Sequence, residues 1–164
     1  MPCLLSQAYG ANQKPKAQQA IFGYQMRQPY ESEAQFFKSR PEVGGMAAGD
    51  GKIVLNPYSK LSQNEKMAVA KNEAARLWIR DNKPKIDIDI NDAQKRFFAG
   101  TEYAQNPQAM KETILARIIS GDPSANADKA QIQAANQLLS QIEKSTAKPT
   151  ITQSIMSAMG MKRK

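Results

Sequence analysis

The stretch SQNEKMAVAKNEAARLWIRDNKP, residues 62–84, contains the strongest helix signal in the chain. Ser62 and Glu65 have the spacing of a capping box, in which each side chain bonds the backbone NH of the other residue. Pro84 ends the pattern because proline cannot continue a helix. The apolar residues recur every three or four positions, which predicts an amphipathic helix from about 63 to 81 with one buried face: Met67, Ala70, Ala74, Leu77 and Trp78.

Three further helices are predicted on the C-terminal side of this stretch. A short helix is expected from a cap at Asn91 through Phe98, and a longer one begins at Asn106-Pro107 and ends before Gly121. Asp128 is placed to cap another helix. The last two carry apolar stripes, and we expect three helices and a strand to hold the core. The stripes are Met110, Ile114, Leu115, Ile118 and Ile119, then Ile132, Ala135, Leu138, Leu139 and Ile142.

Two segments have β character. Residues 43–55 are rich in glycine and contain Asp50-Gly51, which predicts a small hairpin, although a plain glycine loop explains the composition equally well. Ile86, Ile88 and Ile90 alternate with polar residues and predict an edge strand with one buried face. The expected fold class is therefore mainly α: a small helical domain over residues 43–144 with a short β-hairpin or strand element.

Residues 1–42 are predicted to be an extended arm. They are rich in glutamine, are interrupted by four prolines, and show no sustained apolar period. A stretch this polar cannot offset the entropy lost on ordering, roughly 1–2 kcal/mol per residue. Its aromatic residues can each bury a large area on a partner, so we expect them to bind a neighbouring protein: Tyr9, Phe22, Tyr24, Tyr30, Phe36 and Phe37.

Residues 145–164 are predicted to be a linker followed by a short basic helix or tail. The last 18 residues carry four basic residues and no acid. Ile155, Met156 and Met159 would present an adaptable apolar surface to a protein groove. Lys162, Arg163 and Lys164 could contact phosphates weakly and without sequence preference, or serve only as a solvated basic terminus.

Composition excludes much enzyme chemistry. The 164 residues have a net charge of +8, no histidine and one cysteine, so His-based triads and His or multi-Cys metal sites are ruled out. The single Cys3 indicates a reducing, intracellular setting. We expect no export signal, no membrane span and no cofactor.

Three apparent binding motifs fail on inspection. Residues 87–92 resemble the start of a calcium loop, but Asp92 replaces the required Gly and Phe98 replaces the bidentate Glu. The glycines of residues 44–51 lack the ending of a P-loop. A pair of catalytic carboxylates could be drawn from Glu65 and Glu73, but their spacing is typical of ordinary surface acids. No apolar pocket that would raise the pKa of either carboxyl is indicated.

A family resemblance rests on two stretches. The first is VGGMAAGDGKIVLNPYSKLS, residues 43–62, running into NEAAR at 72–76. The second is GTEYAQNP at 100–107, followed by KETILARIISGDPSA at 111–125. Residues 43–127 are thus similar to small uncharacterised virion-associated proteins of short-tailed bacteriophages. The resemblance implies a virion or assembly component and no particular catalytic residues.

These observations leave three functional hypotheses. The first is a non-enzymatic structural or assembly component of a tailed-phage virion, made in the host cytoplasm, present in multiple copies in a symmetric assembly and held to capsid, portal or tail subunits by its terminal arms. The alternative is an internal or ejected DNA-associated virion protein. The third is a carboxylate-based lytic enzyme that would use acids among Glu65, Glu73, Asp87 and Asp89.

Overall fold

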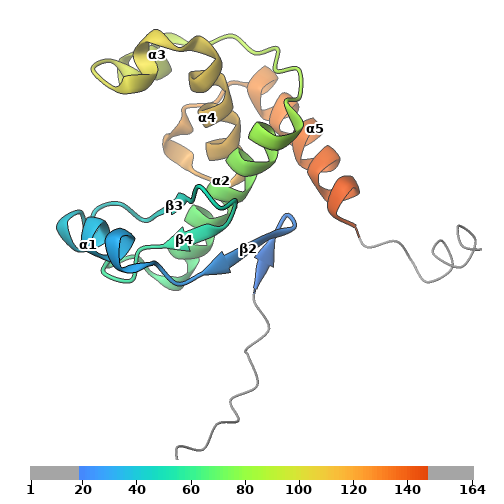
Figure 1. The fold of residues 1–164 in the computed structure, drawn as a ribbon. Helices are drawn as coiled ribbons and strands as arrows, with labels where there is room; N and C mark the ends of the chain where they lie inside the picture. The colour runs from blue at the N-terminus through green and yellow to red at the C-terminus, as the bar shows by residue number, and fades with distance from the viewer. Residues whose placement is uncertain (1–18, 148–164) are drawn as a thin grey trace, which may run out of the picture.

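The computed structural model describes residues 19–147 and confirms a mainly α fold with a small sheet. Figure 1 shows the sheet and α1 at one end of the molecule, α3 to α5 at the other, and α2 between them. We call these the sheet end and the helical end. The α-helices are α1 (Glu31–Ser39), α2 (Gln63–Asn82), α3 (Asp92–Phe98), α4 (Pro107–Ile119) and α5 (Lys129–Thr146). The remaining elements are the 3-10 helices η1 (Glu102–Gln105) and η2 (Pro123–Ala125) and the strands β1 (Ala20–Ile21), β2 (Tyr24–Arg27), β3 (Gly45–Ala47) and β4 (Ile53–Leu55).

Helix α2 lies in the middle of the fold because two of its faces are buried. Its predicted capping box is present: the Ser62 backbone NH donates to Glu65 Oε2 at 2.7 Å, and the Glu65 NH donates to Ser62 Oγ at 3.3 Å. Small residues and Leu77 pack against the strands, whereas Trp78 and Ile79 join the core of the helical end. The helix ends at Lys83, which adopts the left-handed conformation just before Pro84.

The predicted caps of the helical end are confirmed. The side chains of Asn91, Asn106 and Asp128 accept hydrogen bonds from the third residue of α3, α4 and α5, respectively. In α3 and α5 that third residue is a buried glutamine, and the two side-chain amides bond each other. Gln94 Nε2 donates to Gln131 Oε1 at 2.8 Å, and Gln131 Nε2 donates to Gln94 Oε1 at 2.9 Å. This pair joins the starts of two helices inside the core.

The sheet has the order β1-β2-β4-β3. The expected hairpin exists, with β3 antiparallel to β4, and β4 pairs in parallel with β2 from the other side. The hairpin lies tightly on α2, since a Cβ built at Gly44 would be 2.7 Å from Val69 Cγ2. Glycine at this position therefore permits the hairpin to approach the helix.

The prediction that residues 1–42 form an arm without regular structure is wrong for residues 20–39, which form β1, β2 and α1. The backbone of β2 finds its partner in β4, where Met26 lies opposite Ile53, a pairing that no local periodicity reveals. Phe37 is fully buried against Val54 and its neighbours. Long-range pairing thus offsets the entropy that an isolated segment could not recover.

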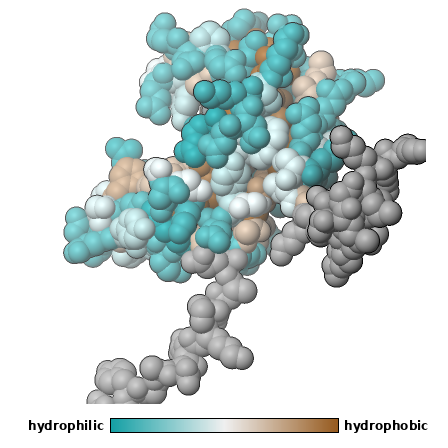
Figure 2. Space-filling view, turned by 45° about the vertical axis from the view of Figure 1, so that its right-hand side comes forward, coloured by the Kyte–Doolittle hydropathy of each residue, from teal (hydrophilic) through white to brown (hydrophobic). Residues whose placement is uncertain are grey.

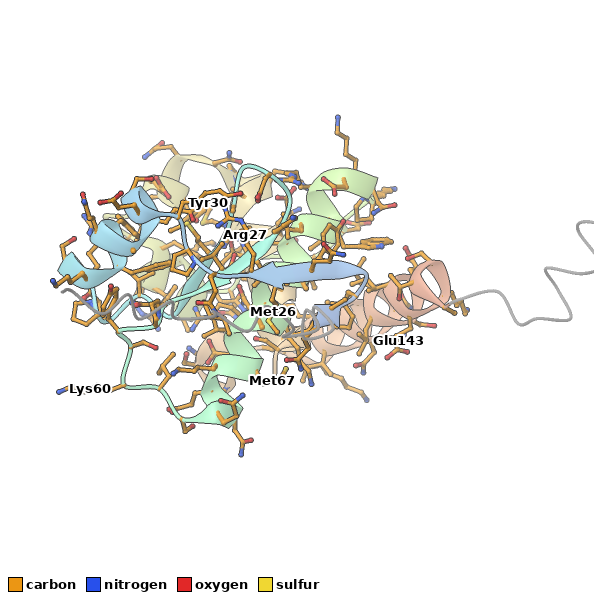
Figure 3. The ribbon with its side chains drawn as sticks, turned by 60° about the horizontal axis from the view of Figure 1, so that its bottom comes forward. Met26, Arg27, Tyr30, Lys60, Met67 and Glu143 are labelled. Atoms are coloured by element: carbon orange, nitrogen blue, oxygen red, sulfur yellow. The ribbon has the colours of Figure 1, made fainter. Side chains whose placement is uncertain are left out.

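One arginine holds the sheet end together (Figure 3). The side chain of Arg27 is only 9% exposed, and its guanidinium bonds Glu33 through two nitrogens at 2.7 and 2.8 Å. A third nitrogen donates to Asp50 at 2.8 Å, and the guanidinium lies 3.8 Å from the centre of the Tyr30 ring. Arg27 therefore joins β2, α1 and the hairpin turn.

The predicted strand at residues 86–90 is wrong, although its burial pattern is right. These residues belong to no helix and pair with no strand in the described chain. Ile88 is buried, and Ile86 and Ile90 pack partly against the helical core. The alternation of apolar and polar residues predicted which side chains are buried, but it does not show whether another strand lies close enough to form hydrogen bonds.

The C-terminal boundary of the domain also shifts slightly. Helix α5 continues to Thr146, two residues past the predicted limit. The predicted partner-binding residues Tyr9, Ile155, Met156 and Met159, and the possible phosphate contacts Lys162, Arg163 and Lys164, lie outside the described residues.

Candidate functional site

A groove of about 660 Å³ lies beside the first half of α2. We call it the Glu73 groove. The start of the hairpin forms one wall and the turn between α4 and η2 forms another. Apolar side chains and carboxylates alternate along it, the principal ones being Leu61, Glu65, Val69, Glu73, Asp122 and Pro123.

Glu73 is half-buried in this groove. Burial raises the pKa of its carboxyl, while the charge of Arg76 and the backbone NH of Ala47 act in the opposite direction. The Arg76 guanidinium is bonded elsewhere, to the hydroxyls of Tyr103 at 3.0 Å and Thr113 at 3.3 Å. Within residues 19–147, no Lys or Arg nitrogen lies within 4.0 Å of the Glu73 carboxylate. The expectation that no acid sits in a pocket that raises its pKa is therefore wrong.

The other two acids of the groove are already bonded within the chain. Hydrogen bonds from the Ser62 side chain and backbone lower the pKa of Glu65. Burial opposes ionisation of Asp122, but hydrogen bonds from Ser124 and Arg117 outweigh it and lower the pKa of Asp122. The Arg117 Nε lies 2.8 Å from Asp122. Of the three acids of the groove, Glu73 is thus the one whose charge the described chain compensates least.

This arrangement supports two kinds of chemistry. A half-buried carboxylate between apolar walls can bind a cationic side chain that also has an aliphatic stem. Glycosidases divide acid and base roles between a carboxyl with a raised pKa and one that stays ionised, and the groove contains one of each kind. Asp87 and Asp89, the other acids considered for that chemistry, lie outside the groove.

Metal binding gains no support from this part of the chain. Across residues 19–147, no three His, Cys, Asp or Glu side chains are grouped so that they could hold an ion. The Asp87–Asp92 segment leads into α3, where Asp92 is the first helical residue.

Three exposed aromatic side chains belong to segments of the sheet end, and we call them together the aromatic end: Tyr30, Phe36 and Tyr58. These side chains are 59%, 39% and 46% exposed. Arg27 lies over the Tyr30 ring and Arg40 over the Phe36 ring, at 3.8 and 5.4 Å from the ring centres. Figure 3 shows Arg27 and Tyr30 together where β2 leads into α1.

Buried Asn56 fixes the position of the aromatic end. Its Nδ2 donates to the carbonyls of Val43 at 2.7 Å and Arg40 at 3.2 Å, and its Oδ1 accepts from the Tyr58 NH at 2.8 Å. The loop that carries Tyr58 is therefore tied to the segment that follows α1.

The predicted partner-binding aromatics divide into two groups. Phe22 and Tyr24 pack against the core of the helical end and against the cluster around Ile53, and Phe37 is buried, so these three stabilise the fold. A hydrogen bond from Tyr24 to Asp81 together with burial, the larger cause, raises the pKa of Tyr24 to about 12. Tyr30 and Phe36 remain available on the surface. Tyr58 escaped prediction because its loop carries no periodic pattern that distinguishes an exposed from a buried tyrosine.

The remaining surface gives little further indication. Figure 2 shows a largely hydrophilic face on which the apolar residues form separate areas. Among the helices of residues 19–147, none combines the length and apolar character needed to cross a membrane.

No protein-family model, curated protein or solved structure matches this chain.

Proposed function

We propose that this protein is a non-enzymatic structural component of a tailed-phage particle, and that it binds a neighbouring subunit through the aromatic end. The observation that carries the proposal is the exposure of Tyr30, Phe36 and Tyr58 on one end of the molecule, with two rings stacked by arginines. Tyrosine and arginine are the residue types that dominate binding energy at protein interfaces.

Rigidity of the aromatic end adds to this support. Arg27 and Asn56 hold its three segments with hydrogen bonds of 2.7 to 3.2 Å. A surface that is already ordered loses less entropy when it binds, so more of its contact energy appears as affinity. The particle as the setting comes from the resemblance of residues 43–127 to virion-associated phage proteins.

Mass spectrometry of purified particles of the encoding phage tests the setting. We expect peptides of this chain in intact particles and at equal abundance in particles emptied of their genome. Loss of the chain together with the genome would favour the DNA-associated alternative. Complete absence of the chain from particles would contradict both.

Surface variants test the binding face. Tyr30→Ser and Phe36→Ser should reduce incorporation of the chain into particles about tenfold or more, because interface hot spots contribute about 2 kcal/mol or more. Phe97→Ser is the matched control, since Phe97 is 52% exposed but lies on α3 at the helical end. Equal incorporation of all three variants would contradict the proposed face.

A carboxylate-based lytic activity is the second candidate, because the Glu73 groove contains a carboxyl with a raised pKa and Asp122 with a lowered one. If the chain cleaves cell-wall glycan, Glu73→Gln should reduce turnover by at least about 100-fold, as expected for loss of a general acid. Glu102→Gln, an exposed acid outside the groove, is the control. Absence of cleavage by the wild-type chain would exclude this candidate.

A further inference from the structure

We infer that the Glu73 groove binds the basic C-terminal segment of this same chain, residues 159–164, with a basic side chain paired to Glu73. This inference concerns the free chain and does not depend on assembly into a particle. Four features of the molecule support it. They are the lack of an ion-pair partner for Glu73 within residues 19–147, the distribution of charge along the chain, the apolar walls of the groove and the length of the C-terminal segment.

The Glu73 carboxylate has no ion-pair partner within residues 19–147. Burial of Glu73 opposes its ionisation more than the charge of Arg76 and the backbone NH of Ala47 favour it, and the other acids of the groove already accept hydrogen bonds from Ser62, Ser124 or Arg117. A Lys or Arg side chain paired with this half-buried carboxylate would offset part of the free-energy cost of its burial.

The charge distribution makes the C-terminal segment complementary to the groove. All 15 acidic residues of the chain lie between residues 31 and 143, and the described part holds 17 basic residues against them. Residues 148–164 hold four basic residues and no acid. The segment therefore contains no acidic side chain of its own to neutralise Lys162, Arg163 or Lys164.

The walls of the groove suit the residues that precede those charges. Leu61, Val69 and Pro123 supply apolar surface on either side of Glu73. Met159 and Met161 stand immediately before the basic residues, and methionine adapts well to irregular apolar grooves. One short segment therefore offers both the apolar and the cationic part of the required ligand.

The C-terminal segment is also long enough. Helix α5 follows η2, which adjoins the groove through Pro123, and its 18 residues run about 27 Å from start to end. The 15 residues from 148 to 162 can span roughly 50 Å when extended. A tether of this kind keeps the effective concentration of the segment at the groove high, in the millimolar range.

Carbodiimide cross-linking of the intact chain tests the inference, because the reagent joins a lysine amine to a carboxylate that it contacts. We expect a dominant link between Glu73 and Lys162 or Lys164, found by mass spectrometry, and at least a tenfold loss of that link in about 1 M salt, where screening shortens to about 3 Å. Glu73→Gln should abolish the link, whereas Glu102→Gln should leave it unchanged. Mixing heavy- and light-isotope chains should give links within one chain only.

Several outcomes would overturn the inference. Links spread evenly over exposed acids outside the groove would show that the segment has no preferred site. Links from Lys14 or Lys16 to Glu73 would assign the groove to the N-terminal segment instead. Mixed-isotope links would assign it to a second copy. Cleavage of cell-wall glycan that Glu73→Gln abolishes would assign the groove to a polysaccharide.

Discussion

The helical end and the sheet end are stabilised in different ways. The helical end encloses one continuous core of ten buried residues that includes Trp78, Phe98 and Ile142. The sheet end has two smaller clusters, one around Ile53 and one around Phe37, and relies on Arg27 and on pairing between distant strands. The comparison teaches that the end proposed to bind a partner is also the end with less core of its own.

The largest expected effect on stability comes from truncating a buried phenylalanine, and it should differ between Phe98 and Phe37. Phe98→Ala should reduce the free energy of unfolding by about 3–5 kcal/mol and lower the stability of the whole domain. Phe37→Ala removes the same ring from a three-residue cluster, so we expect α1 and the hairpin to open first while α4 and α5 stay protected. Hydrogen exchange measured by mass spectrometry distinguishes these results. Equal loss of protection throughout the chain in both variants would show that the two ends unfold as one unit.

The glutamine pair offers the next largest effect. Gln94→Ala leaves Gln131 with fewer partners in the core and also removes half of the α3 capping box. We expect a loss of about 3 kcal/mol, which combines an unsatisfied buried amide with a weakened cap. Denaturant unfolding measures it, with Gln108→Ala on the exposed surface of α4 as control. A loss below about 1 kcal/mol would contradict a joining role for the pair.

The ion cluster of the sheet end should contribute less, because its acids are partly exposed. Arg27→Met keeps the length of the side chain but removes its bonds to Glu33 and Asp50, and we expect a loss of about 1–2 kcal/mol. Denaturant unfolding at neutral pH measures this loss. A change below about 0.5 kcal/mol would contradict the role assigned to the cluster.

The same cluster should give the sheet end an acid dependence. Hydrogen bonds from Arg27 lower the pKa of Glu33 and of Asp50 in the folded state. The contribution of these two carboxylates to the free energy of unfolding is therefore complete above the ordinary range of carboxyl pKa values. It is lost as the pH falls below about 4. When the free energy of unfolding is measured against pH, Arg27→Met should make its decrease in acid smaller. An unchanged decrease would contradict the role assigned to the Arg27 cluster.

The smallest expected effect is that of Glu73→Gln, which should stabilise the chain, whereas the substitutions above destabilise it. Burial raises the pKa of Glu73 in the folded state. The contribution of Glu73 to the free energy of unfolding is therefore present below the ordinary pKa of glutamate, and it is lost as the pH rises through the folded-state pKa. Where no C-terminal cation pairs with Glu73, Glu73→Gln should remove that decline and stabilise the chain by about 0.5–1 kcal/mol near pH 7.5.

The effect should be clearest in a chain that also carries Lys162→Gln, Arg163→Gln and Lys164→Gln, since no C-terminal cation then compensates Glu73. Thermal unfolding across the pH range measures it in both backgrounds. Destabilisation by Glu73→Gln in the triple variant would contradict the account of the groove.

The helical end could be predicted from the sequence because its signals are local. Ser62, Asn91, Asn106 and Asp128 each satisfy a helix terminus through the residue three positions further on, so spacing alone reveals them. The reciprocal bonding of Gln94 with Gln131 was hidden because it joins residues 37 positions apart.

The sheet end could be predicted only in part. The hairpin has a local turn signal, but β2 pairs with a strand 27 residues away and has no recognisable alternation of its own. The candidate groove was missed for a similar reason. Glu73 sits on the charged face of α2 in the sequence pattern, and only the approach of the hairpin and of the turn after α4 buries it.

Hydroxyl-radical footprinting of the chain inside purified particles tests whether the aromatic end binds a neighbouring subunit, because it compares the two ends in a single sample. Relative to the free chain, we predict that Tyr30, Phe36 and Tyr58 lose most of their reactivity while exposed Phe97 at the helical end keeps its own. Protection of Phe97 with unchanged reactivity at the aromatic end would contradict the account, as would no change at either end.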